Sequence, residues 1–196
     1  MKDAQVSELL LQALEHEKGG VQIYETALKC AVMPQLADEW QQYLDQTRMH
    51  VRVLTEVLAV LKIDLYKETA GRQIVRQNGA ALVHAMEAAL QSTDKEAAQL
   101  VACDCVILAE TKDHANWELI GQVAKNLRGE GADVLKNAYE QIEAEEDEHL
   151  YHSKGWGREL WMHSLGLKSV LPPPEETRHV KSAREAARVS EERARS

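Results

Sequence analysis

The sequence QIEAEEDEHLYH at residues 141–152 carries five acidic residues and two histidines within twelve positions. A run of charges usually forms a solvated helix face, because ionised side chains are rarely buried. Glu146 and His149, however, lie three residues apart, and on a helix both fall on the side that also carries the apolar Ile142. The other acidic residues of the run fall off this side and can stay solvated, namely Glu143, Glu145, Asp147 and Glu148. The segment therefore predicts a helix that presents two ligand-type side chains to a protein interior.

Length and charge narrow the class of protein. The chain has 196 residues, which is enough for one domain with a sizeable core. Its formal net charge of -9 argues against a nucleic-acid or anionic-membrane partner, because either would require a basic surface. No apolar run reaches the length of a membrane span, and no signal-peptide pattern is present. We therefore expect a cytoplasmic protein that binds neither nucleic acid nor membranes.

The three cysteines point to no special chemistry. They are Cys30, Cys103 and Cys105, and no pair has the Cys-x-x-Cys spacing of a zinc ribbon. The sequence predicts buried free thiols.

The residues around the acidic run predict long helices. Proline occurs only at residue 34 and at 172–174, while helix-forming residues dominate between these breaks. The predicted long helices cover 5–32, 35–62, 94–127 and 132–154. Thr93 and Glu96 have the spacing of a capping box at the start of the third. A shorter helix is predicted near 80–90, within the connection between the second and third.

Each long helix has an apolar stripe that is interrupted by polar residues near its middle. Stepping alternately by three and four residues identifies these interruptions. They are Glu17 in the first helix, Thr47 and His50 in the second, Glu110 and Asp113 in the third, and Glu146 and His149 in the fourth. The middles of antiparallel helices lie at one level, so these residues should meet.

The sequence therefore predicts an all-α fold with two parts. Residues 1–168 are expected to form an antiparallel four-helix bundle with a long crossover between its second and third helices. Residues 169–196 are expected to form a charged tail that begins at the prolines and has little apolar surface to bury alone.

The meeting of several carboxylates in one interior predicts a bound cation. An isolated buried carboxylate is very costly, and mutual repulsion would raise some of the pKa values. No lysine or arginine lies on any of the four stripes, so a divalent metal is the simplest source of positive charge. Oxygen ligands mixed with two imidazoles suit iron, manganese or zinc. The predicted metal ligands are Glu17, His50, Glu110, Asp113, Glu146 and His149.

These motifs resemble those of the ferritin-like superfamily, in particular rubrerythrin-like and bacterial stress-associated members. Carboxylate di-iron bundles of that superfamily use a Glu from each of two helices and Glu-x-x-His from the other two. The residues that carry the resemblance are Glu146 with His149, Glu17 with Tyr24 seven residues on, and Glu110 with Trp117 at the same spacing. The resemblance implies one or two iron ions per chain and reaction with dioxygen or peroxide.

The second helix departs from the family pattern. Thr47 stands three residues before His50, where the family has a Glu that commonly bridges two metals. Asp113 could replace the lost charge, or the site could hold one metal. Two functions therefore stay open: an iron-dependent redox protein that handles oxygen or peroxide, and a helical scaffold or stress-response protein with a vestigial site and no catalysis. The sequence does not identify an electron donor, and it leaves open whether the chain forms a homodimer.

Overall fold

The computed structural model describes residues 3–91, 94–129 and 131–195. These residues form helices and connecting segments, with no β-strand among them, so the predicted all-α class is confirmed. The helices are α1 (Asp3–Cys30), α2 (Pro34–Val60), α3 (Ala70–Leu90), α4 (Lys95–Asn126), α5 (Ala132–Ser164), α6 (Pro174–Thr177) and α7 (Ala183–Ala194). None of these helices combines the length and the apolar character that crossing a membrane requires.

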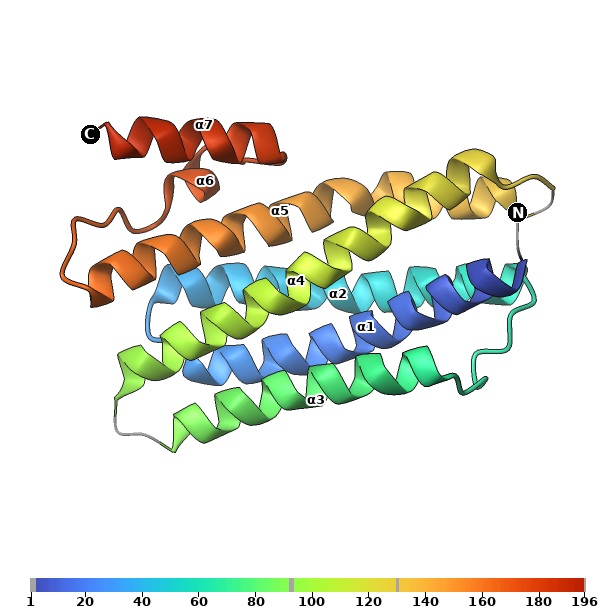
Figure 1. Cartoon of the computed structure of the whole chain (residues 1–196), viewed down its shortest axis with the longest axis horizontal. Coiled ribbons are helices and arrows are strands. Elements are labelled where there is room, and N and C mark those ends of the chain that lie inside the picture. Colours follow the sequence, from blue (N-terminus) through green and yellow to red (C-terminus); the bar gives the residue numbers. More distant parts are fainter. Residues whose placement is uncertain (1–2, 92–93, 130, 196) are drawn as a thin grey trace.

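Five long helices pack side by side. α1 contacts α2, α3 and α4, while α5 contacts α4 and α2 (Figure 1). Short connections join α1 to α2 and α4 to α5, whereas the chain between α2 and α4 runs along the length of the molecule and contains α3 (Figure 1). The long connection was thus predicted, but α3 begins ten residues earlier than the predicted 80–90 helix and covers one face of α1 and α4.

A buried ion pair fixes the start of α3. Arg72 is only 4% exposed, and its guanidinium donates two hydrogen bonds to Glu15 of α1, at 2.7 and 3.1 Å. A third nitrogen donates to the backbone carbonyls of Leu65 and Lys67, each at 2.9 Å. Because every face of the charged group is satisfied, the arginine can be buried and can attach α3 to α1.

α5 continues to Ser164 instead of ending at residue 154, where Gly155 and Gly157 suggested a break. Glycine inside a helix costs about 1 kcal/mol relative to alanine, but both positions lie at close helix contacts. A Cβ at Gly157 would approach Ile107 Cδ1 to 2.4 Å, and one at Gly155 would approach Glu175 Oε2 to 2.7 Å. These glycines allow close packing and do not end the helix.

The predicted start of α4 can be checked only in part. Thr93, the first residue of the predicted capping box, lies outside the described residues. Asp94 caps the helix instead, since its side chain accepts a hydrogen bond from the backbone nitrogen of Ala97. Such a cap contributes about 1 kcal/mol to helix stability.

The apolar core is divided into two clusters with a polar layer between them. One cluster includes Tyr24, Leu36, Trp40, Val106 and Trp156, and the other includes Leu10, Leu54, Leu58, Trp117 and Ile120. α1, α2, α4 and α5 each contribute to both clusters, and the predicted polar residues lie where each helix passes from one cluster to the other. All three cysteines are free and buried, as predicted. The two clusters hold the polar layer in the interior from both ends.

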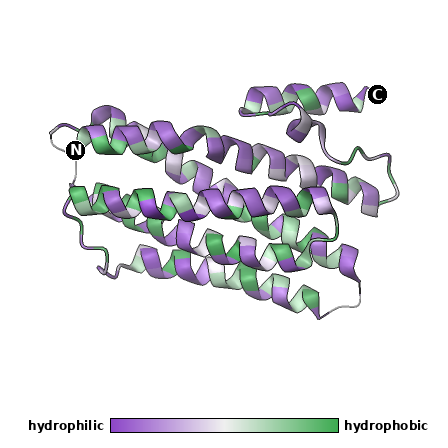
Figure 2. Cartoon of the chain, turned by 180° about the vertical axis from the view of Figure 1, so that it is seen from behind, coloured by the Kyte–Doolittle hydropathy of each residue, from purple (hydrophilic) through white to green (hydrophobic). Residues whose placement is uncertain are grey.

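The C-terminal segment packs on the outer side of α5 (Figure 1). Val180 and Val189 form a small apolar cluster with Leu150 and Tyr151 of α5. The rest of α7 is mainly hydrophilic (Figure 2). α6 and α7 therefore lie outside the two main clusters but are attached to the helical body, whereas Leu171, which precedes them, packs against the cluster that contains Trp156.

We expect Glu175→Gln to loosen this attachment. Glu175 is 2% exposed and accepts two hydrogen bonds from Arg158, one of them at 2.9 Å. Losing a buried charge-assisted pair costs about 1–3 kcal/mol. Trypsin should therefore cut within residues 178–195 roughly tenfold faster in this variant, since about 1.4 kcal/mol is a factor of ten. The exposed Glu191→Gln serves as the control, and equal rates for both variants would contradict the contact.

Candidate metal centre

The polar layer brings together residues from four helices. It contains Glu17 of α1, His50 of α2, Glu110 and Asp113 of α4, and Glu146 and His149 of α5, each no more than 4% exposed. Two groups of these residues have potential ligand atoms within 4.8 Å of one another: Glu17 with His50 and Glu146, and Glu110 with Glu146 and His149. Glu146 belongs to both groups, so it stands at the centre of the layer.

His50 directs one ring nitrogen into the layer and the other away from it. Its Nδ1 lies 2.9 Å from Glu146 Oε1 and 3.5 Å from Glu17 Oε2. Its Nε2 lies 2.8 Å from Glu145 Oε2, which can only accept a hydrogen bond when ionised. In the neutral imidazole this contact places the proton on Nε2 and leaves the Nδ1 lone pair facing the two buried carboxylates.

His149 repeats this arrangement from α5. Its Nδ1 lies 3.6 Å from Glu110 Oε2 and 3.8 Å from Glu146 Oε1. Its Nε2 lies 2.9 Å from the amide oxygen of Gln46, which is an acceptor. Histidines that ligate metals almost always donate their other ring N–H to such an oxygen, because this fixes the tautomer and the ring orientation.

Tyr24 and Trp117 each form a hydrogen bond with one oxygen of a buried carboxylate, Glu110 and Glu17 respectively. Tyr24 of α1 donates its hydroxyl to Glu110 Oε1 at 2.8 Å, and Trp117 of α4 donates its indole N–H to Glu17 Oε1 at 2.9 Å. On each of these two helices the aromatic residue follows the carboxylate by seven positions. It bonds not to that carboxylate but to the carboxylate of the other helix. The second oxygen of each carboxylate stays free to bind another group.

Several buried atoms of the layer have no hydrogen-bond partner among the described residues. They are Glu17 Oε2, Glu110 Oε2, Asp113 Oδ1 and Glu146 Oε2. No lysine or arginine in residues 3–91, 94–129 or 131–195 forms an ion pair with these four carboxylates. Leaving a buried polar atom unpaired is costly, so the donor set fits a divalent cation.

The electrostatics of the layer agree with this reading. Burial, together with the charge of Glu17, raises the pKa of Glu146 to about 7. Burial alone would lower the pKa of His50, but the charge of Glu17 and hydrogen bonds to Glu145 and Glu146 hold it well above its usual value. Without another cation, protons are thus retained in the layer to balance its negative charge.

Asp113 and Thr47 lie in the polar layer but belong to neither of the two groups of ligand atoms. Asp113 is buried, and burial, followed by the charges of Glu17 and Glu146, raises its pKa well above the usual value, but it belongs to neither of the two groups. Thr47 is also buried, and its hydroxyl donates to the backbone carbonyl of Tyr43 at 2.8 Å. The carboxylate that the two groups share is that of Glu146, and neither Asp113 nor Thr47 takes this position.

Sequence reasoning missed one of the two residues that orient the imidazoles. It left Glu145 in the solvated part of the acidic run, yet its side chain is only 29% exposed and contacts His50. Gln46 was recognised from the sequence, because it lies four residues before His50 and can form a hydrogen bond beside the ligands. Its partner in the structure, His149 of α5, was not predicted.

A cavity of about 210 Å³ lies beside the layer. Its lining includes the buried Glu146 and Trp117 and, from the C-terminal segment, Ser182 and Ala183. His114 and Asp147 also line it and are joined by a 2.7 Å contact. Glu146, the residue shared by the two groups, thus borders this cavity.

Comparisons with protein-family models, with curated proteins and with solved structures found no match for this chain. The resemblance to ferritin-like proteins thus rests on the motifs and on the geometry above, and it stays a prediction.

Proposed function

We propose that this chain is a ferritin-like metal-binding protein with an iron-dependent redox function toward oxygen or peroxide. In this proposal α1, α2, α4 and α5 form the antiparallel four-helix bundle, and α3 belongs to the crossover between the second and third bundle helices. The observation that carries the proposal is the convergence of unpartnered buried ligand atoms in two groups that share Glu146. Manganese and zinc are alternative ions for the same donor set.

Each residue of the layer has a distinct role in the proposal. Glu17 and His50 would hold one ion and Glu110 and His149 a second, with Glu146 between them. Bound iron would supply electron transfer to dioxygen or peroxide. Glu145 and Gln46 keep the imidazole lone pairs directed inward, while Tyr24 and Trp117 keep one oxygen of Glu110 and of Glu17 oriented. These contacts organise the ligands before any ion arrives.

One observation favours the alternative of a scaffold with a vestigial site. A protonated His50 would lie between Glu146 and Glu145, at 2.9 and 2.8 Å, and would neutralise part of the layer without any metal. The missing carboxylate at Thr47 agrees with such a loss of function. The two functions differ in whether the layer binds an ion at all.

Metal analysis of protein purified without added metal, followed by anaerobic titration with Fe(II) and Mn(II), tests the proposal. We expect one or two ions per chain and a higher thermal midpoint, since a ligand at 100 times its Kd stabilises the fold by about 2.7 kcal/mol. Affinity should fall from pH 8 to pH 6, because a proton on Glu146, whose pKa is about 7, must leave before an ion binds. No binding at micromolar metal and no change in midpoint would support the scaffold instead.

A further inference from the structure

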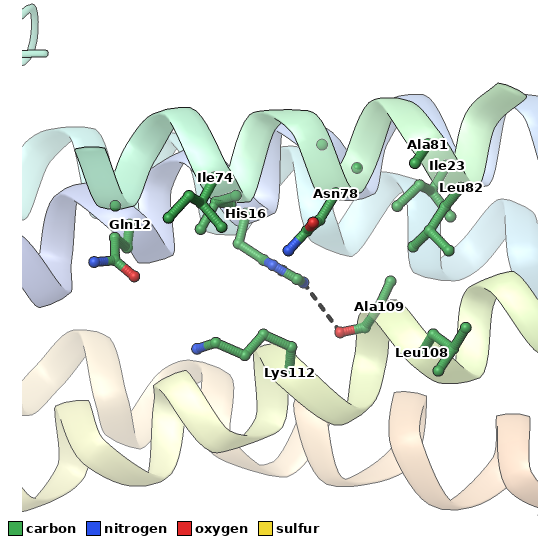
Figure 3. A pocket seen from close by; sticks show the side chains of 14 residues that line it. Gln12, His16, Ile23, Ile74, Asn78, Ala81, Leu82, Leu108, Ala109 and Lys112 are labelled. Atoms are coloured by element: carbon green, nitrogen blue, oxygen red, sulfur yellow. Dashed lines mark hydrogen bonds between the residues drawn. The ribbon is translucent and has the colours of Figure 1, made fainter. Parts of the chain in front are cut away.

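A second cavity, of about 520 Å³, lies between α1, α3 and α4, where α3 covers the other helices. Figure 3 shows three polar residues, Gln12, His16 and Lys112, toward one end of the cavity, where Ile74 also lies. Ile23 and Leu82 lie toward the other end. The volume is in the range of about 300–1,000 Å³ that is usual for small-molecule sites.

Two glycines keep this cavity open. A Cβ added at Gly19 of α1 would meet no atom within 4 Å, and one added at Gly79 of α3 would meet only the Gly19 Cα, at 3.7 Å. Alanine would therefore fit at either position, and in a helix interior it would be more favourable than glycine by about 1 kcal/mol. The cavity is thus kept at some cost in helix stability, which indicates a use for the space.

Large apolar side chains remain exposed at the same place. Ile74 of α3 is 57% exposed and Leu108 of α4 is 62% exposed, and both line the cavity. Covering such side chains removes apolar surface from water and contributes about 25 cal/mol per Å². An apolar body lying in the cavity would cover them.

The polar end favours a negatively charged group. Lys112 forms no ion pair with a carboxylate in the described part of the chain, and its ammonium donates only to the amide oxygen of Asn116. His16 lies beside it and contacts the backbone carbonyl of Ala109 at 3.0 Å (Figure 3). The charge of Lys112 also interacts with that of Asp113, the next residue of the chain. A lysine without a salt bridge next to an apolar cavity is suited to an anionic head with an apolar chain.

We propose that this cavity binds a small amphiphilic organic anion, namely a carboxylate with an apolar chain, whose head lies near Lys112 and whose chain runs past Ile23, Leu82 and Leu108. The site is separate from the metal layer, although His16 and Ala109 are the chain neighbours of Glu17 and Glu110. The proposal does not depend on metal binding.

Titration calorimetry of the full chain with decanoate and with the uncharged decanol tests the site. Both should bind, decanoate more tightly, with a Kd below about 1 mM. Gly79→Leu fills the cavity and should remove binding of both probes, while the thermal midpoint does not fall and the metal content stays unchanged. Lys112→Gln should weaken decanoate at least tenfold and leave decanol unaffected, whereas the exposed Lys125→Gln should change neither.

Three results would overturn the proposal. The first is no decanoate binding at millimolar concentration. The second is binding that Gly79→Leu does not change, which would place the probe elsewhere on the surface. The third is a dimer in sedimentation experiments that Gly79→Leu dissociates, because the exposed Ile74 and Leu108 would then belong to an interface between two copies of the chain.

Discussion

We expect replacement of Glu146 with glutamine to abolish the proposed metal binding and to leave a helical protein. Glu146 is the one residue that belongs to both candidate ligand groups, so its loss removes a donor from each. Changes to residues that merely support a metal ligand cost about 10–100-fold in affinity, and loss of a shared ligand should cost at least about 100-fold. Metal content by mass spectrometry and the metal-induced rise in thermal midpoint should both disappear.

The metal-free variant should be at least as stable as the wild type. Its glutamine has the size of the glutamate and can still accept a hydrogen bond from His50 Nδ1, but it removes one of the crowded buried charges. Glu140→Gln is a matched control on the exposed side of α5, where a 3.6 Å contact with Lys136 is worth only about 0.3–0.5 kcal/mol. Unchanged metal content in Glu146→Gln would show that any bound ion lies outside the polar layer.

The spacing of a few residues was enough to predict that the polar side chains near the middle of each long helix lie close together. Glu146 and His149 are three residues apart, as a ligand pair on one helix face must be, and both are 1% exposed. The same rule identified Glu17, His50 and Glu110. Such positions can be read from sequence because the helix period and the apolar residues on either side decide which face is buried.

The packing of α3 could not be predicted in the same way. Its first turns contain Arg72, which on its own indicates a solvated surface. The arginine is buried only because Glu15, fifty-seven residues earlier, pairs with it. The two roles of Glu145 and Gln46 were only partly visible for a similar reason: Gln46 was recognised from its spacing to His50, but the partner of each residue is an imidazole of a different helix.

The length of α5 illustrates a further limit of local patterns. Gly155 and Gly157 have low helix propensity, so the sequence alone favours a break. Ile107 of α4 and Glu175 of the tail fill the space beside these glycines, and a larger side chain at either would clash. The contacts that allow glycine inside this helix come from segments distant in the sequence, so the residues around the glycines do not reveal them.

Thr47→Glu is expected to lower the stability of the metal-free protein and to raise its metal content toward two ions per chain. Thr47 is 3% exposed on α2, three residues before His50, so a glutamate there would add another buried carboxylate to the layer. An uncompensated buried charge costs about 3–5 kcal/mol, which the thermal midpoint of the metal-free variant should register. Thr47 packs closely on Gly20 of α1, since a Cβ added at Gly20 would lie 3.2 Å from Thr47 Cγ2.

Thr47→Gln separates the charge of the new side chain from its size. Glutamine has the volume of glutamate and should disturb the packing against Gly20 to a similar degree, but it adds no anion. If the missing charge limits occupancy, only the glutamate variant gains metal, and its midpoint rises more on metal addition than that of the wild type. Equal metal content in the two variants would mean that Glu146 already supplies all the shared negative charge that the layer requires, and that Thr47 is no defect in the site.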